Sequence, residues 1–143
     1  MTQAEQVAAW MYPAEQRIRG IGLGAELRNR PRRRAPLEFV GPMVGPGEHA
    51  LVDAIASKPF LGDTIRVAGD VANAFQLDSI TVGNLAQTRN ATLPATSCSP
   101  ASPLRLLDWC PARGLVRIRV TNISTKRMAF RCVLEGDQVE AAE

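Results

Sequence analysis

The sequence predicts an all-β protein, an antiparallel β-sandwich or barrel that follows a basic N-terminal arm. After residue 36, hydrophobic residues alternate with polar ones along several short segments, and this period of two is typical of half-buried strands. Ten Pro and eleven Gly among 143 residues supply many turns between these segments, which favours β structure over a helical bundle. No segment of the sequence resembles a strand–helix–strand unit of a parallel sheet.

Charge divides the chain near residue 36. Residues 1–36 carry seven Arg and three Glu, a net charge of +4, whereas residues 37–143 carry ten basic and eleven acidic side chains, a net charge of −1. We therefore predict a basic N-terminal arm over residues 1–36 and a β-sandwich domain over residues 37–143. The second part is long enough for one modest hydrophobic core.

The arm is predicted to begin with a short amphipathic helix over residues 3–12. Residues 2–5, Thr-Gln-Ala-Glu, match a capping box, in which side chains satisfy free backbone amides at the start of a helix. Val7, Trp10 and Met11 follow at helical spacing, and a proline ends the run. So short a helix is not stable alone. We therefore expect these three side chains to dock on the chain's own domain or on a neighbour.

The rest of the arm combines glycines with a run of Arg, and we expect it to be extended or irregular and ordered only by a partner. Arg binds both carboxylates and phosphates bidentately. These side chains could therefore pair with acids of a neighbouring subunit, neutralise the phosphates of a nucleic acid, or form a solvated linker. No aromatic residues lie between them, which argues against a platform for stacking single-stranded bases. The predicted partner-binding cations are Arg28, Arg30, Arg32, Arg33 and Arg34.

The β domain is predicted to contain about six to eight short strands. Residues 115–122 and 128–135 show the clearest alternation, and residues 123–127 are expected to form a hairpin loop between them. In residues 75–82 the apolar positions change parity, which predicts a β-bulge at Asp78 and Ser79. Weaker strands are expected at 61–67, 48–55, 37–40, 91–95 and 104–107, and residues 136–143 are expected to be a frayed end.

Residues 88–112 give poor strand signals. They hold four Pro with several Ser and Thr, which predicts one long loop, and long loops are often functional. Trp109 lies in this segment, and a large aromatic side chain in a loop is a candidate anchor for a partner. The alternative is that Trp109 packs locally over the edge of the sandwich.

Motifs that would indicate catalysis are few. Residues 20–25, Gly-x-Gly-x-x-Ala, formally match a dinucleotide-binding fingerprint, but no strand precedes the glycines and no strand–helix–strand unit follows. The single histidine, His49, cannot form a multi-histidine metal site. Cys98, Cys110 and Cys132 are widely spaced, which argues against a disulfide framework and a Cys-based zinc site. We expect no enzymatic activity, no cofactor and no metal.

The sequence contains no run of about 20 apolar residues of the kind that spans a bilayer. It also lacks a basic segment followed by an apolar core at its N-terminus, the pattern of a secretory signal. We therefore expect no membrane span, no secretion by a signal peptide, and folding in a cytoplasm.

Residues 75–87, Phe-x-Leu-x-x-Ile-x-Val-Gly-Asn-x-x-Gln, resemble small jelly-roll structural proteins of virus particles, in which a bulged strand leads into a Gly-Asn turn. Residues 116–124 and 130–134 resemble the closing hairpin of these proteins. The resemblance is to bacteriophage-type minor capsid or decoration proteins and covers about residues 60–135. It implies a self-associating jelly roll in a virion, folded in the host cytoplasm, whose arm reaches copies of itself and other shell proteins.

These observations predict a non-enzymatic structural protein of a symmetric assembly, with a virion minor capsid or decoration protein as its expected form. In this hypothesis the arm docks to neighbouring subunits through its helix and its Arg residues. Edge strands of a sandwich need cover, and packing between subunits would supply it. The alternative function is a nucleic-acid-binding module that uses the Arg-rich arm.

Overall fold

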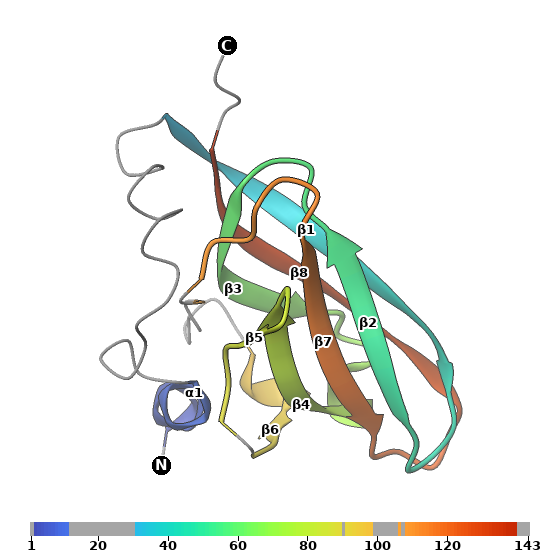
Figure 1. The fold of residues 1–143 in the computed structure, drawn as a ribbon. Coiled ribbons are helices and arrows are strands. Elements are labelled where there is room, and N and C mark those ends of the chain that lie inside the picture. Colours follow the sequence, from blue (N-terminus) through green and yellow to red (C-terminus); the bar gives the residue numbers. More distant parts are fainter. Residues whose placement is uncertain (1, 12–30, 90, 99–105, 107, 140–143) are drawn as a thin grey trace.

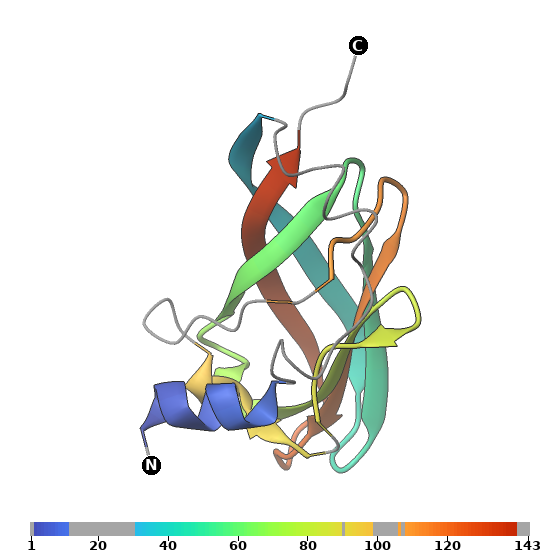
Figure 2. The same cartoon turned by 60° about the vertical axis from the view of Figure 1, so that its left-hand side comes forward.

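The computed structural model describes residues 2–11, 31–89, 91–98, 106 and 108–139, and shows two antiparallel sheets with a short helix beside them (Figure 1). Figure 2 shows the helix lying across one end of the sandwich. The elements are α1 (Gln3–Trp10), β1 (Arg32–Val44), β2 (His49–Ile55), β3 (Phe60–Val67), η2 (Ala72–Ala74), β4 (Phe75–Val82), β5 (Leu85–Ala86), β6 (Leu93–Pro94), η3 (Ala95–Ser97), β7 (Leu115–Asn122) and β8 (Met128–Val139).

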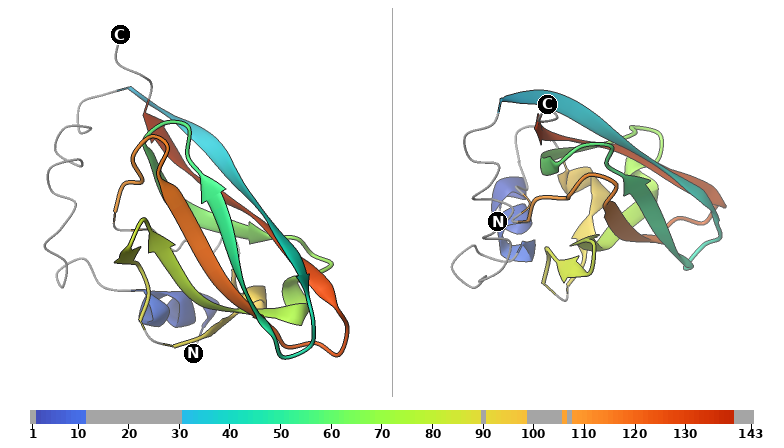
Figure 3. Two further views of the ribbon diagram at one scale, coloured as in Figure 1. Left: turned by 45° about the vertical axis from the view of Figure 1, so that its right-hand side comes forward. Right: turned by 45° about the horizontal axis from the view of Figure 1, so that its top comes forward.

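The strands form two layers, which Figure 3 shows from two further directions. One sheet has the order β1-β8-β3, and the other has the order β2-β7-β4-β5, with β6 also paired to β4. Every pair is antiparallel. The predicted antiparallel β-sandwich is therefore confirmed.

The pairing of the strands is nested. The first strand pairs with the last, β1 with β8, and the second pairs with the last but one, β2 with β7. β3 has a second neighbour in the segment 106–110, where Leu106 N donates to Gly62 O at 2.8 Å and Cys110 forms an isolated bridge with Phe60. Nested pairing distributed over two sheets is the connectivity of a jelly roll, with the strand beside β3 reduced here to that bridge.

Alternation along the central strands builds the hydrophobic core. Val116, Ile118 and Val120 of β7 are fully buried, while the residues between them lie on the outer face. Phe130 of β8 meets Phe75 of β4 edge to face, with ring centroids 5.3 Å apart. This contact joins the two sheets at the centre of the sandwich.

The predicted β-bulge in β4 is confirmed. The register between β4 and β7 shifts between Leu77 and Ser79, so that Asp78 is the extra residue. As a result Leu77 and Ile80, which have opposite parity in the sequence, are both fully buried.

Several predicted boundaries differ from the structure because β1 and β8 pair over their whole length. β1 begins at Arg32, so the sheet includes Arg32–Pro36, which we had assigned to the arm. An edge strand tolerates Pro36, because a proline needs no donor on the side that faces no neighbour. β8 extends to Val139, so residues 136–139 belong to the sheet and not to a frayed end.

Two loop predictions are also corrected. Residues 123–127 are not a hairpin loop, because β7 and β8 lie in different sheets and the segment crosses between them. The strand expected at 91–95 is reduced to Leu93–Pro94, and Leu106 lies in no strand. The rest of the strand expected at 104–107 lies outside the described residues.

A glycine pair brings β3 close to β8. Gly62 and Gly136 are direct partners across the two strands. A Cβ atom at Gly136 would lie 2.7 Å from Gly62 Cα and would collide with the Leu61 carbonyl group. Neither obstacle is a flexible side chain, so the backbone itself would have to move.

We predict that Gly136→Ala destabilises the fold by about 1–3 kcal/mol, because it overpacks a rigid contact. Gly69→Ala is the matched control, since a Cβ atom there meets nothing within 4 Å. That change should alter stability by less than about 1 kcal/mol. Urea unfolding of the two variants measures both effects, and equal stabilities would contradict the importance of the close approach.

Candidate functional site

α1 begins as the sequence predicts. The Thr2 side chain accepts a hydrogen bond from Glu5 N at 3.1 Å, which caps the helix. The helix ends at Trp10, two residues before the predicted end.

The three apolar side chains of the arm are covered by the chain's own domain, one of the two destinations expected from the sequence. Val7, Trp10 and Met11 are all buried. The Trp10 indole N–H donates to Ala91 O at 2.8 Å, and Arg89 N donates to Trp10 O at 2.7 Å. These two bonds attach the end of α1 to the segment that follows β5.

Polar side chains extend the same contact to η3. Ser97 Oγ donates to Gln6 Oε1 at 3.0 Å, and Gln3 Nε2 donates to Thr96 O at 3.3 Å. Met11 forms an isolated bridge with Thr88. The helix therefore docks on residues 88–97, a segment that sequence reasoning treated as part of a long loop.

The described Arg residues of the predicted cluster lie at the start of β1, and Arg28 and Arg30 lie outside the described residues. Arg32, Arg33 and Arg34 are exposed and face Val139, Gln138 and Asp137 of β8, respectively, across the strand pair. They therefore belong to the sheet and not to an irregular arm.

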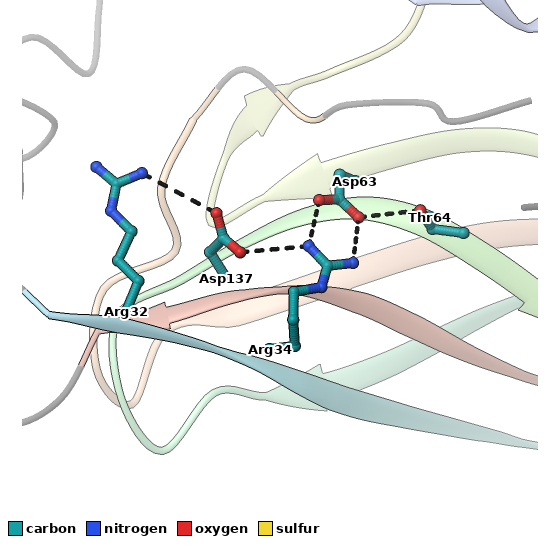
Figure 4. Close-up of polar contacts among 5 residues, drawn as sticks. All are labelled: Arg32, Arg34, Asp63, Thr64 and Asp137. Carbon is teal, nitrogen blue, oxygen red and sulfur yellow. Dashed lines mark hydrogen bonds and ion pairs between the residues drawn. The ribbon is translucent and has the colours of Figure 1, made fainter.

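Arg34 bonds to carboxylates of two neighbouring strands (Figure 4). Its guanidinium donates to both oxygens of Asp63 in β3, at 2.5 and 2.8 Å, and to Asp137 Oδ1 in β8 at 3.3 Å. Thr64 Oγ1 donates to Asp63 Oδ1 at 2.9 Å and orients that carboxylate. The hydrogen bonds to Asp63 raise the pKa of Arg34 above its ordinary value.

Arg32 makes two weaker contacts. Its guanidinium is 4.0 Å from Asp137 Oδ2 and lies over the Trp109 ring, 5.1 Å from the ring centroid. Trp109 is half-buried, and this cation–π contact lies within the chain. The structure thus brings together two predicted site residues that are far apart in the sequence.

Sequence reasoning missed the acidic partners of the Arg cluster. The sequence places Asp63 in the weak strand expected at 61–67 and Asp137 in the expected frayed end. The only sequence feature that pointed to these acidic partners was the charge balance, because the cationic arm is followed by acidic residues that could neutralise it. The pairs are largely exposed, so each adds only about 0–1 kcal/mol to stability.

A second candidate surface is the free edge of β2, which ends the order β2-β7-β4-β5. Asn122 N donates to Glu48 O and Ala56 N donates to Gly114 O, so even-numbered residues direct their backbone groups toward the β7 side. The odd-numbered residues of β2 therefore direct their backbone N–H and C=O groups away from β7. A row of such groups is a template for another strand.

Apolar side chains mark the same edge strand. Leu51 is 51% exposed and Ile55 is 67% exposed, both on the outer face. Another edge strand, β1, also exposes apolar side chains, at Val40 and Met43. The sequence showed the alternation in β2 but not that β2 lies at an edge.

Asp53 lies between Leu51 and Ile55 on the outer face of β2, and its charge is neutralised within the chain. Arg117 of β7 donates from Nε to Asp53 Oδ1 at 2.7 Å and from NH2 to Asp53 Oδ2 at 3.0 Å. These hydrogen bonds lower the pKa of Asp53 below its ordinary value. The outer face of β2 thus carries a closed ion pair between two exposed apolar side chains.

Among the described side chains we find no metal-binding cluster and no reactive thiol. No group of three or more His, Cys, Asp and Glu is placed to hold a metal ion within those residues. All three thiols are free, and burial raises the pKa of Cys98 to about 12 and of Cys110 to about 11. Such thiols are poor nucleophiles.

Comparison with family models, with curated proteins and with solved structures found no match. In the part of the chain that the structure describes, no helix is long and apolar enough to cross a membrane.

We predict that the Asp53 carboxyl titrates below the ordinary value of 3.8 and that Arg117→Ala raises its pKa toward that value. The pair stabilises the fold above the ordinary carboxyl pKa, and this stabilisation is lost as the pH falls through the lowered pKa of the folded state. Carboxyl-carbon NMR measures both titrations. Identical midpoints in the two proteins would show that Arg117 does not hold the carboxylate.

Proposed function

We propose that this chain is a non-enzymatic structural subunit of a symmetric assembly. The observation that carries the proposal is the β2 edge, where outward-directed backbone groups coincide with the exposed side chains of Leu51 and Ile55. Monomeric proteins protect such edges with charges, prolines or covering loops. Here the one charge on the outer face between these side chains, Asp53, is neutralised by Arg117.

A virus particle is the kind of assembly that we propose for this subunit, as a minor capsid or decoration protein folded in the host cytoplasm. Two-sheet jelly rolls serve as building blocks of viral capsids. The nested strand pairing supports this proposal, together with the resemblance of residues 75–87 to such proteins, whereas the closing hairpin that residues 116–124 and 130–134 resemble is not formed. Copies of the chain and other shell proteins would be its partners.

The arm would join subunits by exchange. α1 docks on the described residues of the segment 88–97, and residues 11–31 separate α1 from β1 in sequence. The same contacts made with the domain of a neighbour would link two chains at little cost, since no new interface is required.

Nucleic-acid binding is the weaker candidate. A phosphate that approached Arg34 would have to displace Asp63 and Asp137, which already hold its guanidinium. Arg32 similarly contacts Trp109 and Asp137. We therefore expect only weak binding of DNA or RNA through these two residues.

We predict that the purified chain forms a discrete oligomer and that Leu51→Glu combined with Ile55→Glu dissociates it. Each Glu would place a charged, hydrated side chain where an apolar one meets the neighbouring copy, and we expect the dissociation constant to rise at least about tenfold. Native mass spectrometry and light scattering measure the change. Ile123→Glu is the control, because Ile123 is 54% exposed but lies outside β2. A wild-type monomer at all concentrations would contradict self-association.

Arm exchange is tested by a disulfide between α1 and η3. Gln3→Cys with Thr96→Cys joins two positions that contact one another, in a background in which the three native cysteines are replaced by Ser. Exchange predicts covalently linked chains on a non-reducing gel after mild oxidation. Cross-linked single chains alone would show that the helix stays on its own domain.

A further inference from the structure

A polar chain of three side chains crosses the outer face of the β2-β7-β4 sheet. Thr121 Oγ1 donates its one proton to Asp78 Oδ2 at 2.6 Å. The contact of 2.6 Å between His49 Nδ1 and Thr121 Oγ1 is then an N–H donated by the imidazole, because the hydroxyl proton is already used. His49 therefore carries its proton on Nδ1 when neutral, and Nε2 is left as an acceptor.

The β-bulge supports this chain. The extra residue, Asp78, is brought onto the outer face, where its side chain is only 15% exposed. Its second oxygen, Oδ1, accepts from Gln76 Nε2 at 3.3 Å. Both oxygens are therefore held by neighbouring side chains, which fixes the position of the carboxylate beside the imidazole.

Two Arg residues of β7 on this face differ in what they bind. Arg117 donates two hydrogen bonds to the Asp53 carboxylate, so its charge is already paired. Arg119 reaches only to within 3.9 Å of Asp78 Oδ2, beyond hydrogen-bond distance, and its side chain is 50% exposed. Arg119 is therefore in a long ion pair with Asp78, but among the described side chains it has no hydrogen bond like those that hold Arg117, so its N–H donors can also reach a ligand.

Arg119 and His49 meet in a depression of about 380 Å³. Its other lining residues are Asp78, Ser79, Ala91 and Thr92, so two hydroxyl groups also reach it. This volume lies within the range of about 300–1,000 Å³ that is usual for small-molecule sites. One wall is attached to α1, because the Trp10 indole donates to the carbonyl oxygen of Ala91 at 2.8 Å.

We infer that this depression binds a small ligand that carries a phosphate group. Arg119 donates to the charged oxygens, Ser79 offers a hydroxyl donor, and the free Nε2 of His49 accepts from a protonated phosphate oxygen. This site uses side chains on the face of the sheet and not the backbone groups at the edge of β2. Thr121 and Asp78 are positioning residues, since they act through the imidazole.

The test is a titration of the ¹⁵N-labelled full chain with inorganic phosphate at about pH 8, where phosphate is a dianion that keeps one proton. We expect saturable shifts at Ser79, Thr92 and Arg119. Arg119→Ala should weaken binding at least about tenfold, the effect of losing one charge-assisted contact. Arg117→Ala is the matched control and should change the affinity less than about twofold.

Sulfate separates the role of His49 from simple attraction to a cation. It has the same shape and charge as a phosphate dianion but no proton to donate to Nε2, so it should bind more weakly than phosphate. His49→Ala should remove this difference while Arg119 still attracts both ions. Non-saturable shifts, equal losses in the two Arg variants, or equal affinity for the two ions would each overturn the inference.

Discussion

The pairing of β1 with β8 is the constraint on which the rest of the structure depends. It joins the beginning of the described domain to its end, over Arg32–Val44 and Met128–Val139. With this pair in place, β3 can bind only the other side of β8, and the second sheet follows the same nested order. β1 and β2 each end their sheet, and both carry exposed apolar side chains.

Local elements could be predicted from the sequence because their signals are local. The period of two predicted the bounds of β7, and the parity change in β4 predicted a bulge that the register confirms. Sheet partners could not be predicted, because the long strands pair with segments that lie tens of positions away in the sequence, and β1 and β8 with residues as far apart as Arg32 and Val139. For this reason residues 123–127 suggested a hairpin, although they connect two different sheets.

The Arg cluster shows why a charge pattern alone does not identify a partner. Seven Arg before residue 37 suggested a cation-rich arm that awaits an anion. The fold supplies the anions from within, since β3 and β8 bring Asp63 and Asp137 beside Arg34. Exposed ion pairs of this kind add little stability. Their main consequence is to reduce the availability of Arg34 for phosphates.

The outer face of the β2-β7-β4 sheet carries exposed apolar side chains and charged side chains close to one another. In the register of β2 with β7, Leu51 is the direct partner of Arg119, and Asp53 is the direct partner of Arg117. A strand added to the free edge of β2 would extend the sheet beside Leu51 without covering Arg119, because edge pairing lies in the plane of the sheet. The depression at His49 opens on the face of the sheet. Self-association through the edge and ligand binding on the face are therefore compatible in geometry, and each depends on different atoms of the same strands.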